Sequence, residues 1–380
     1  MANVRIALFT PFNPNAGGGG VIFRSLLPYL QGAEVRWFYL SNSTSSLADT
    51  TRLGPSIFGG PLMTDGMASI RLFVAQSDAR IDGHVKTILD WSPDIAWANA
   101  MNEGLLVGTR LRDAGVKRLH VSVHDDPAGL AHKSKRYRIF APFIDRCTRA
   151  LLTRADTVDV VCDAMRTYYS NRFGINSGVV FRYIQELNLP PVEDVDESVV
   201  AIGHVGSAYS APEVFAFLNA LRSISQADGI RFRLFNFGIS PAMTAAGREF
   251  PEMVENAGDV AEPEVVRRLQ QCKFLYSMYS FNPRHRVFRE TSQPTKMSTY
   301  LMAAKPIFVH CPEESSTQAM LERFKLGLCV TTMDTSQIEI GIREILKFHL
   351  DRNVVSKAAE FYCGKQNLEC LGASLGLSLP

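Results

Sequence analysis

Short apolar segments alternate with amphipathic segments along most of the chain. An apolar run of about four to eight residues is typical of a buried strand, whereas apolar residues three or four positions apart are typical of a helix. Strands are predicted at residues 4–10, 34–40, 69–74, 94–98, 118–124, 158–161, 179–183, 231–238, 274–279, 307–309 and 327–331, with another beginning at Val199. Helices are predicted at residues 21–30, 81–91, 103–114, 134–154, 164–172, 212–225, 262–271, 296–304, 336–348 and 351–370. This alternation predicts an α/β protein with parallel sheets.

One stretch interrupts the alternation and divides the chain. Residues 187–198 (LNLPPVEDVDES) contain a proline pair and an acidic run with little to bury, which is typical of a linker. We therefore expect a first domain over residues 1–186 and a second over residues 199–348, followed by a helical segment over residues 349–380. Residues 41–66 are rich in Ser, Thr, Gly and Pro, and we expect irregular structure there.

Composition narrows the class of protein. The 380 residues are 46% hydrophobic and 21% charged, as in ordinary globular proteins, and the net charge of +2 predicts no strong attraction to nucleic acid. We see neither a signal peptide nor an apolar run near the roughly 18 residues that a membrane span needs. The seven cysteines are scattered without a C-x-x-C pair, which favours reduced thiols and a cytoplasmic location.

The segment 289–310 (RETSQPTKMSTYLMAAKPIFVH) combines a loop, a helix and a buried strand. Pro294 disfavours helical geometry at the residue before it, and Thr295 is an expected N-cap. The free backbone N–H groups and the dipole at a helix N-terminus attract anions, and Lys296 adds a cation there. The segment therefore predicts an anion-binding site.

The run PTKMSTYLMAAKPI within this segment resembles the donor-binding segment of GT-B glycosyltransferases, especially the family-4-like retaining enzymes, which reads roughly P-x-K-x-x-E-Y-x-A-x-G-K-P-V. The resemblance implies two Rossmann-like domains facing a cleft, with a C-terminal helix crossing back to the first domain. It implies that a sugar moves, with retention, from a nucleoside diphosphate sugar to a hydroxyl of a glycan or lipid-linked glycan, as in polysaccharide biosynthesis. It also implies that no metal and no other cofactor takes part.

The same resemblance assigns roles within segment 289–310. It implies that Pro294, Thr295 and Lys296 lie near the donor diphosphate. Thr299 stands where the family usually has the glutamate that holds the donor ribose, so ribose recognition departs from the family pattern. We expect Glu290 to supply a carboxylate near the donor sugar or ribose.

The turn after the strand that begins at Val199 is the second expected contact with the donor. The resemblance places Gly206 and Ser207 against the donor phosphates, where the family usually also has an arginine and a lysine. No Arg or Lys occurs from Ser207 to Ala220. We therefore expect the positive charge to come from Lys296 and from a polar loop over residues 280–292, whose cations are Arg284, Arg286 and Arg289.

A glycine-rich loop precedes the helix predicted at residues 21–30. Strand, Gly-rich loop and helix form the layout of a phosphate-binding turn, although the spacing matches neither a dinucleotide fingerprint nor a Walker loop. The resemblance implies that Gly18 and Gly19 face the donor and the acceptor. A flexible surface loop is the alternative interpretation.

His124 and Asp125 follow directly on the strand predicted at residues 118–124. Ligands of open α/β sheets bind beyond the carboxyl ends of strands, so this pair is a candidate catalytic site. His124 could hydrogen-bond a sugar hydroxyl or stabilise developing charge, and Asp125 could orient it or accept from an acceptor hydroxyl. An Asp-Pro turn with a capping carboxylate is the alternative.

Residues 133–154 form a basic amphipathic pattern in which Pro142 is expected to kink or split the helix. Such a helix can lie on an anionic membrane, in agreement with the lipid-linked acceptors of several enzymes of the resembled type. It can equally be a packed helix with a solvated basic face. The first interpretation places the protein peripherally at the inner membrane face.

Two other functions fit the same pattern. One is a nucleotide-sugar epimerase on the same fold. The other is a non-catalytic protein that binds a glycan or a partner and has lost its donor site, which Thr299 and the missing Arg and Lys after Gly206 would favour.

Overall fold

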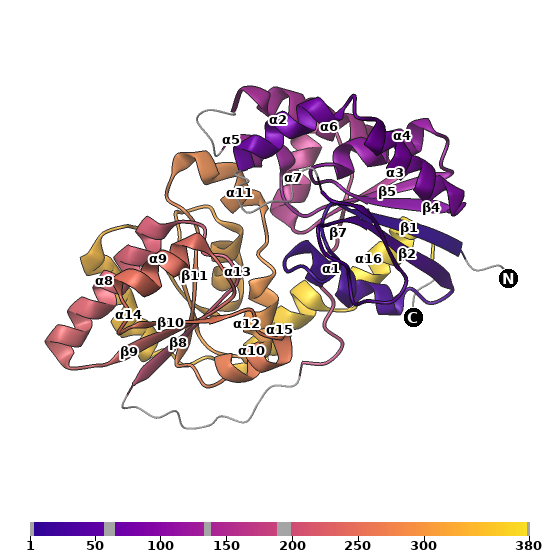
Figure 1. Cartoon of the computed structure of the whole chain (residues 1–380). Coiled ribbons are helices and arrows are strands. Elements are labelled where there is room, and N and C mark those ends of the chain that lie inside the picture. Colours follow the sequence, from indigo (N-terminus) through magenta and orange to yellow (C-terminus); the bar gives the residue numbers. More distant parts are fainter. Residues whose placement is uncertain (1–3, 57–64, 133–137, 188–198, 378–380) are drawn as a thin grey trace. The chain divides into compact units, whose positions relative to one another are not determined.

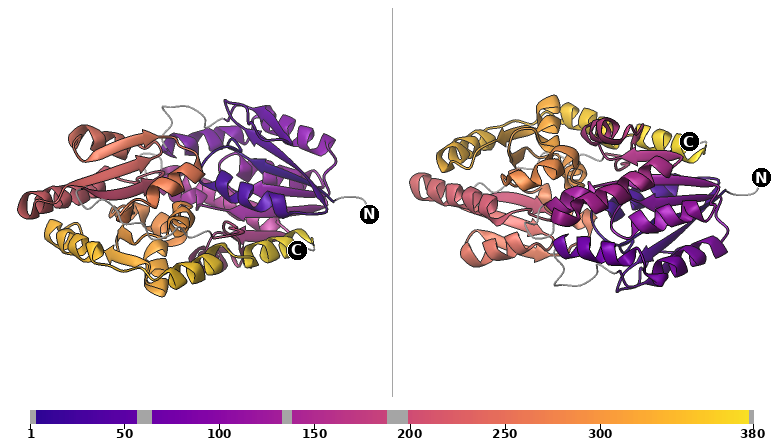
Figure 2. Two further views of the ribbon diagram at one scale, coloured as in Figure 1. Left: turned by 90° about the horizontal axis from the view of Figure 1, so that it is seen from below. Right: turned by 90° about the horizontal axis from the view of Figure 1, so that it is seen from above.

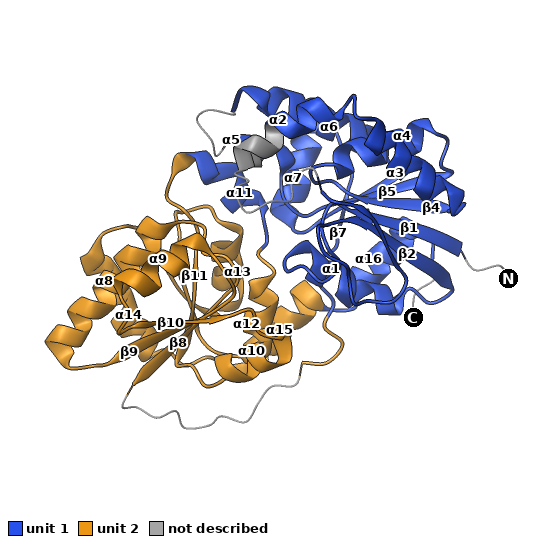
Figure 3. Cartoon of the chain, viewed as in Figure 1, with its two compact units in different colours: residues 1–183, 284–293, 364–380 blue, residues 184–283, 294–363 orange. Residues whose placement is uncertain are grey.

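The computed structural model describes residues 4–56, 65–132, 138–187 and 199–377. The chain divides into two compact units (Figure 3). Unit 1 comprises residues 1–183, 284–293 and 364–380, and unit 2 comprises residues 184–283 and 294–363. Each unit is built on one parallel sheet with helices on both faces (Figures 1 and 2).

Within the described residues, the sheet of unit 1 has seven strands in the order β3-β2-β1-β4-β5-β6-β7. Their bounds are β1 Val4–Thr10, β2 Ala33–Leu40, β3 Thr50–Gly54, β4 Ile95–Asn99, β5 Arg118–Val123, β6 Thr157–Val160 and β7 Gly178–Val179. The strand order reverses between β1 and β4. In sheets of this kind the crevice at such a reversal, beyond the carboxyl ends of the strands, is the usual ligand site.

Helices of unit 1 form one layer on each face of its sheet (Figure 1). Helices α3, α4 and α6 pack against one another on one face, and α16 packs on β6 and β7. The helices of this unit are α1 Gly19–Leu26, α2 Asp65–Ala75, α3 Ala79–Asp90, α4 Gly104–Asp113, α5 Pro127–His132, α6 Ala141–Arg154, α7 Asp163–Phe173, α11 Arg286–Thr291 and α16 Gln366–Leu375. Three-residue 3-10 turns occur at Leu27–Tyr29 (η1) and Arg138–Phe140 (η2).

The described part of unit 2 has a sheet of six strands in the order β10-β9-β8-β11-β12-β13. Their bounds are β8 Val200–Val205, β9 Phe232–Phe237, β10 Val254–Gly258, β11 Phe274–Met278, β12 Ile307–His310 and β13 Gly327–Val330. Here the order reverses between β8 and β11, so the loops that follow these two strands are where a ligand is expected.

Helices of unit 2 also lie in two layers. Helix α8 packs against α9 and α14, whereas α12 packs against α10 and α15. The bounds are α8 Ala211–Asp228, α9 Pro241–Glu249, α10 Glu262–Leu269, α12 Lys296–Ala303, α13 Ser316–Phe324, α14 Thr335–Leu346 and α15 Arg352–Cys363, with a 3-10 turn at Pro283–His285 (η3). The ends of α8 follow its sequence: Pro212 lies in its first turn, and Gly229 takes the left-handed conformation that terminates it.

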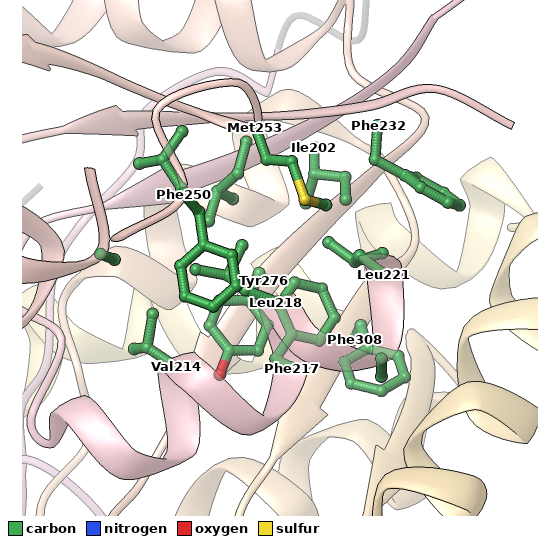
Figure 4. Packing of buried hydrophobic residues seen from close by; sticks show 14 of the residues in the cluster. Ile202, Val214, Phe217, Leu218, Leu221, Phe232, Phe250, Met253, Tyr276 and Phe308 are labelled. Carbon is green, nitrogen blue, oxygen red and sulfur yellow. The ribbon is translucent and has the colours of Figure 1, made fainter. Parts of the chain in front are cut away.

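The core of unit 2 is an aromatic cluster between α8, the sheet and α14 (Figure 4). Phe217 of α8 stacks on Tyr276 of β11 at a centroid distance of 4.0 Å and lies 5.3 Å from Phe308 of β12. All three rings are fully buried. Burial of each such side chain contributes about 1.5–3 kcal/mol, so this cluster anchors the strands whose ends carry the candidate site.

Two predictions in unit 1 are wrong. Residues 69–74, predicted as a strand, lie in helix α2, and the third strand of the sheet is β3, within the stretch 41–66 that was expected to be irregular. Apolar runs of about six residues cannot distinguish a strand from a buried helix by periodicity alone. β3 is an edge strand whose residues are only partly buried, so it lacks the apolar run that marks interior strands.

Three other predictions need correction. The polar loop expected over residues 280–292 contains η3 and α11, and α6 begins at Ala141 with Pro142 in its first turn, where proline is tolerated. The helix predicted over residues 351–370 is two helices, α15 and α16, separated at Gly364. α15 belongs to unit 2, whereas α16 packs on the sheet of unit 1.

Candidate functional site

The loops after β8 and β9 approach each other closely at two glycines. Gly206 has a φ of 72° and Gly238 a φ of 121°, conformations that residues with a side chain rarely adopt. A Cβ atom on Gly238 would lie 3.0 Å from the Gly206 Cα, and the Gly206 N–H donates to the Phe237 carbonyl. The two glycines therefore allow the backbone of the Gly206–Ser207 loop to pack closely against the loop that follows β9.

Lys296 lies in the same region, at the first residue of α12. Its side chain is buried, and Nζ donates to the Ser207 carbonyl oxygen at 2.7 Å and to His204 Nε2 at 3.3 Å. Nζ also lies 5.2 Å from the centroid of the Tyr209 ring. The structure thus joins Lys296 and Ser207, two residues predicted separately from segments far apart in the sequence.

Burial distinguishes Lys296 from the other lysines that the structure describes. Within the described part of the chain, no carboxylate lies within ion-pair distance of its Nζ, and burial alone lowers the pKa of Lys296 to about 7. A buried ammonium group without an acidic partner is costly, which makes the position a candidate for function rather than for stability. An anion bound beside Lys296 would supply the missing counter-charge.

Thr295 and Thr299, on either side of Lys296, have contacts that the sequence did not predict. Thr295 occupies the N-cap position, but it has helical dihedral angles and its side chain makes no capping hydrogen bond. The Pro294 carbonyl accepts from the Met297 N–H at the start of the helix. Thr299, one turn after Lys296, is buried and donates from Oγ1 to Glu262 Oε1 at 3.0 Å. A carboxylate therefore does lie at Thr299, supplied by α10.

The predicted residues Arg286, Arg289 and Glu290 lie on α11, in unit 1. Arg286 Nε donates to Glu290 Oε1 at 2.6 Å, an i,i+4 pair whose arginine is 63% exposed. Arg289 is half-buried, and its Nε and Nη1 atoms are buried without a hydrogen-bond partner within the described residues. Arg289 is therefore a cation with donors available for an anion.

The glycine-rich loop and the histidine after β5 meet in unit 1. Gly18 has a φ of 59°, and a Cβ atom on Gly19 would lie only 2.7 Å from His124 Nδ1. The His124 ring packs on Phe23 of α1 at 4.8 Å. Its Nδ1 atom is buried without a partner among the described residues, and burial lowers the pKa of His124 to about 4. His124 is therefore neutral at neutral pH, and Gly19 leaves the space that its ring needs.

Two aspartates follow His124 and have different roles. Asp126 is buried and accepts from the Gly129 N–H and from the Tyr169 hydroxyl, so it caps α5. Asp125 is half-buried, and its Oδ1 accepts from the Ser292 hydroxyl at 2.5 Å. The capping alternative considered for this turn applies to Asp126, and Asp125 remains a candidate for chemistry.

Sequence reasoning missed two members of these groups. His204 is the fully buried residue that contacts the Lys296 amine, and Glu262 bonds Thr299. A histidine within an apolar strand that ends in a glycine turn was a usable signal for the first. Glu262 carries no such signal, because its proximity to Thr299 depends on the packing of α10 against α12.

The described residues contain neither a cluster of metal ligands nor a helix that could cross a membrane. No group of three or more His, Cys, Asp or Glu side chains is placed to hold a metal ion there. None of the helices in that part of the chain combines the length and the apolar character that crossing a membrane requires.

No protein-family model and no curated protein matches the chain, but solved structures share its fold. A trehalose-phosphate synthase (UDP-forming) from Burkholderia xenovorans, in complex with glucose-6-phosphate, superposes with a TM-score of 0.67 at 13% identity, covering 98% of this chain and 100% of that one. The UDP-GlcNAc 2-epimerase from Methanocaldococcus jannaschii gives 0.54 at 11% identity, covering 98% and 100%. A mutant of S. aureus TarM in complex with fondaparinux, alpha-GlcNAc-glycerol and UDP gives 0.56 at 13% identity, covering 78% and 58%. The prediction of two Rossmann-like domains of the GT-B type is confirmed.

Proposed function

We propose that the protein is a glycosyltransferase that moves a sugar from a nucleoside diphosphate sugar to a hydroxyl group of a glycan or lipid-linked acceptor. The observation that carries this proposal is Lys296, a buried amine without an acidic partner among the described residues, at the strand-order reversal of unit 2. Bond cleavage at the anomeric carbon leaves negative charge on the departing diphosphate. Fixed positive groups in a site shielded from water stabilise such charge strongly.

The remaining residues have proposed roles in the same reaction. Lys296 and the N-terminus of α12, with the backbone of Gly206 and Ser207, hold the diphosphate, and Arg289 supplies a further cation with available donors. His124 is kept neutral by burial, so it can exchange a hydrogen bond with a sugar hydroxyl without adding charge. Asp125 and Glu290 are the carboxylates proposed for the acceptor hydroxyl and the donor sugar. Retention and independence of a metal belong to this proposal.

A nucleotide-sugar epimerase is the second candidate, favoured by the likeness to the UDP-GlcNAc 2-epimerase. The two functions differ in what happens without an acceptor. A transferase leaves the nucleotide sugar largely intact, whereas an epimerase converts it into its stereoisomer. Proton NMR of the sugar during incubation with the enzyme alone therefore separates the two.

We further propose that unit 1 contacts an anionic membrane. The predicted segment 133–154 is described only from residue 138 onward, and there it meets α2, which packs on η2 and α6. Exposed apolar and basic side chains on these three elements define the α2–α6 surface, which consists of Phe73, Val74, Arg138, Ile139, Arg146 and Arg149. Apolar side chains that enter the headgroup region beside arginines match a bilayer with anionic lipids. The proposed location is peripheral, at the inner face of the membrane.

Ligand-induced thermal stabilisation tests the donor site. We expect one of the nucleoside diphosphates or nucleotide sugars with uracil, guanine, adenine or thymine to raise the melting temperature, because a ligand at about 100 times its Kd adds about 2.7 kcal/mol to the folded state. Lys296→Met should abolish the shift.

Lys305→Met is the matched control, since it removes the same charge just beyond the other end of α12. It should leave the shift unchanged. If no nucleotide stabilises the protein while a glycan does, the transferase proposal is wrong and the non-catalytic binding function replaces it.

A further inference from the structure

A chain of hydrogen bonds runs behind Lys296 through three side chains of unit 2, of which Asn236 and His204 are buried and Asn256 is exposed. The Asn256 amide donates to the Met243 carbonyl, and Asn256 Oδ1 accepts from Asn236 Nδ2 at 2.8 Å. Asn236 Nδ2 also donates to the Gly238 carbonyl at 3.0 Å. Both amide protons of Asn236 are therefore used in these two bonds, and its Oδ1 atom is free to accept a hydrogen bond from His204 on β8.

This arrangement fixes the tautomer of His204. Its Nδ1 lies 2.8 Å from Asn236 Oδ1, which can only accept, so Nδ1 carries the proton. Nε2 then presents a lone pair toward Lys296 Nζ at 3.3 Å. Burial, and after it the charge of Lys296, keeps the pKa of His204 well below its ordinary value, which holds the ring neutral.

Lys296 therefore has two neutral acceptors, His204 Nε2 and the Ser207 carbonyl, which hold the amine in place without supplying negative charge. We infer that His204, oriented by Asn236, is a positioning residue that fixes Lys296 where its amine takes up a proton when a diphosphate binds, so that nucleotide binding is coupled to proton uptake. This inference rests on the proposed role of Lys296 in binding the diphosphate of the nucleotide sugar, and it adds that the affinity of this site depends on pH.

Several other titratable and charged groups lie around α12. The Tyr300 hydroxyl donates to the Tyr276 carbonyl, and burial raises the pKa of both tyrosines, so they stay neutral. Tyr209 presents its ring to the amine. Helix α10, which packs against α12, carries Glu262, whose carboxylate accepts from Thr299, and an ion-paired surface cluster of Glu264, Arg267 and Arg268. Helix α15, which also packs against α12, carries Arg352, Lys357 and Glu360.

The expected proton number follows from the burial of the amine. With the pKa of free Lys296 at about 7, the site is mostly neutral at pH 8 and mostly charged at pH 6. A bound diphosphate favours the charged form and raises this pKa. Binding should therefore take up about 0.9 proton at pH 8 and about 0.1 at pH 6, and affinity should fall about tenfold per pH unit above pH 7.

Isothermal titration calorimetry of the full chain measures this proton number directly. UDP-glucose, UDP-N-acetylglucosamine, GDP-mannose and ADP-glucose are suitable probes, because a nucleotide sugar has no titrating phosphate near neutral pH. The slope of the observed enthalpy against the ionisation enthalpy of the buffer gives the protons taken up. Binding at pH 8 with a slope of zero overturns the inference while leaving the proposed function intact, whereas absence of binding to every probe contradicts the proposed function.

Variants at His204 test the positioning role. His204→Phe keeps the ring volume but removes the acceptor, and we expect about 10- to 100-fold weaker binding and a changed pH profile, because hydrogen bonds to charged groups contribute strongly. His204→Gln places an amide oxygen near the position of Nε2 and should restore most of the affinity. Equal loss in both variants with an unchanged pH profile would indicate only a structural role.

A measurement without ligand or mutation completes the test. Nitrogen-15 NMR of the histidine side chains distinguishes a ring protonated at Nδ1 from one protonated at Nε2. We expect the resonances of His204, assigned by their absence in His204→Gln, to show Nδ1 protonated throughout the neutral range. A proton on Nε2 overturns the positioning role, whether or not a nucleotide binds.

Discussion

Lys296 shows at the scale of one residue how function and stability oppose each other. An amine whose pKa falls from 10.5 to about 7 on folding destabilises the native state, because the charged form loses its hydration. The cost is fully present below pH 7, where the folded and unfolded states are both protonated. It decreases as the pH rises from 7 toward 10.5, because there the unfolded state binds the proton and the folded state does not.

Replacing this amine by an apolar side chain of similar length should therefore stabilise the protein. We expect Lys296→Met to raise the free energy of unfolding at pH 7 by roughly 1–4 kcal/mol, as found when buried charged groups give way to apolar ones. The gain should shrink at about pH 9.5, since the wild-type penalty is then partly relieved. Urea denaturation of both proteins at the two pH values measures the difference.

The contrary outcome is equally informative. If Lys296→Met is less stable than the wild type at neutral pH, the hydrogen bonds to His204 and Ser207 outweigh the desolvation of the amine. Lys296 would then be a structural residue, and its role as a costly functional group would be lost.

At the scale of elements, the sequence predicted those whose pattern is continuous and missed those that depend on their surroundings. β1, β5 and β11 are interior strands that are buried over most of their length, and they lie where the pattern placed them. β3 and α2 were confused because an edge strand is only half covered and a short apolar run fits either structure. α11 was taken for a loop because it is only six residues long and half of these residues are charged.

In the candidate site too, local sequence predicted the position of a residue but not its contacts with distant parts of the chain. The position of Lys296 at a helix start was predictable, because proline, N-cap and helical spacing occur together within a few residues. The contacts that determine its chemistry were not, since Ser207 and His204 precede it by 89 and 92 residues and reach it only through the strand order β8-β11-β12. Glu262 reaches Thr299 in the same way, through the packing of α10 on α12.

The start of α1 depends on a glycine because a neighbouring element approaches it. A Cβ atom at Gly19 would lie 2.7 Å from His124 Nδ1 and 3.0 Å from the Phe12 ring, so either the His124 ring or the helix must shift. We expect Gly19→Ala to destabilise the protein by about 1–3 kcal/mol, the usual cost of overpacking. It should also lower the proposed transferase activity by moving His124.

Gly17→Ala is the matched control, since a Cβ atom there meets nothing within 4 Å. Both variants change the loop entropy by the same small amount, so their difference isolates the contact with His124. Chemical denaturation and nucleotide-sugar turnover measure the two effects. Equal behaviour of Gly19→Ala and Gly17→Ala would show that the loop is a flexible surface segment without a catalytic contact.

At the scale of the whole molecule, the net charge of +2 is too small to attract the protein to any polyanion. Any attraction to a membrane must therefore come from a local surface. The α2–α6 surface combines exposed apolar side chains with exposed arginines. Ile139 is 73% exposed and Val74 is 65% exposed, so both side chains are accessible to a lipid headgroup region. Arg146 and Arg149 are exposed on α6, which packs against the elements that carry these two residues.

Vesicle co-flotation tests this surface in the full chain. We expect the protein to float with vesicles of phosphatidylcholine and phosphatidylglycerol, to bind pure phosphatidylcholine weakly, and to be released by salt, because its arginines act over about one Debye length. Ile139→Asp should weaken binding about tenfold or more, since it removes an apolar side chain worth roughly 2 kcal/mol on burial and adds a repelled charge. Ile340→Asp is the control, because Ile340 is 48% exposed on α14 of unit 2. Equal flotation of the two variants would mean that the basic helix is only the solvated face of a packed domain, and the lipid-linked acceptor would lose its structural support.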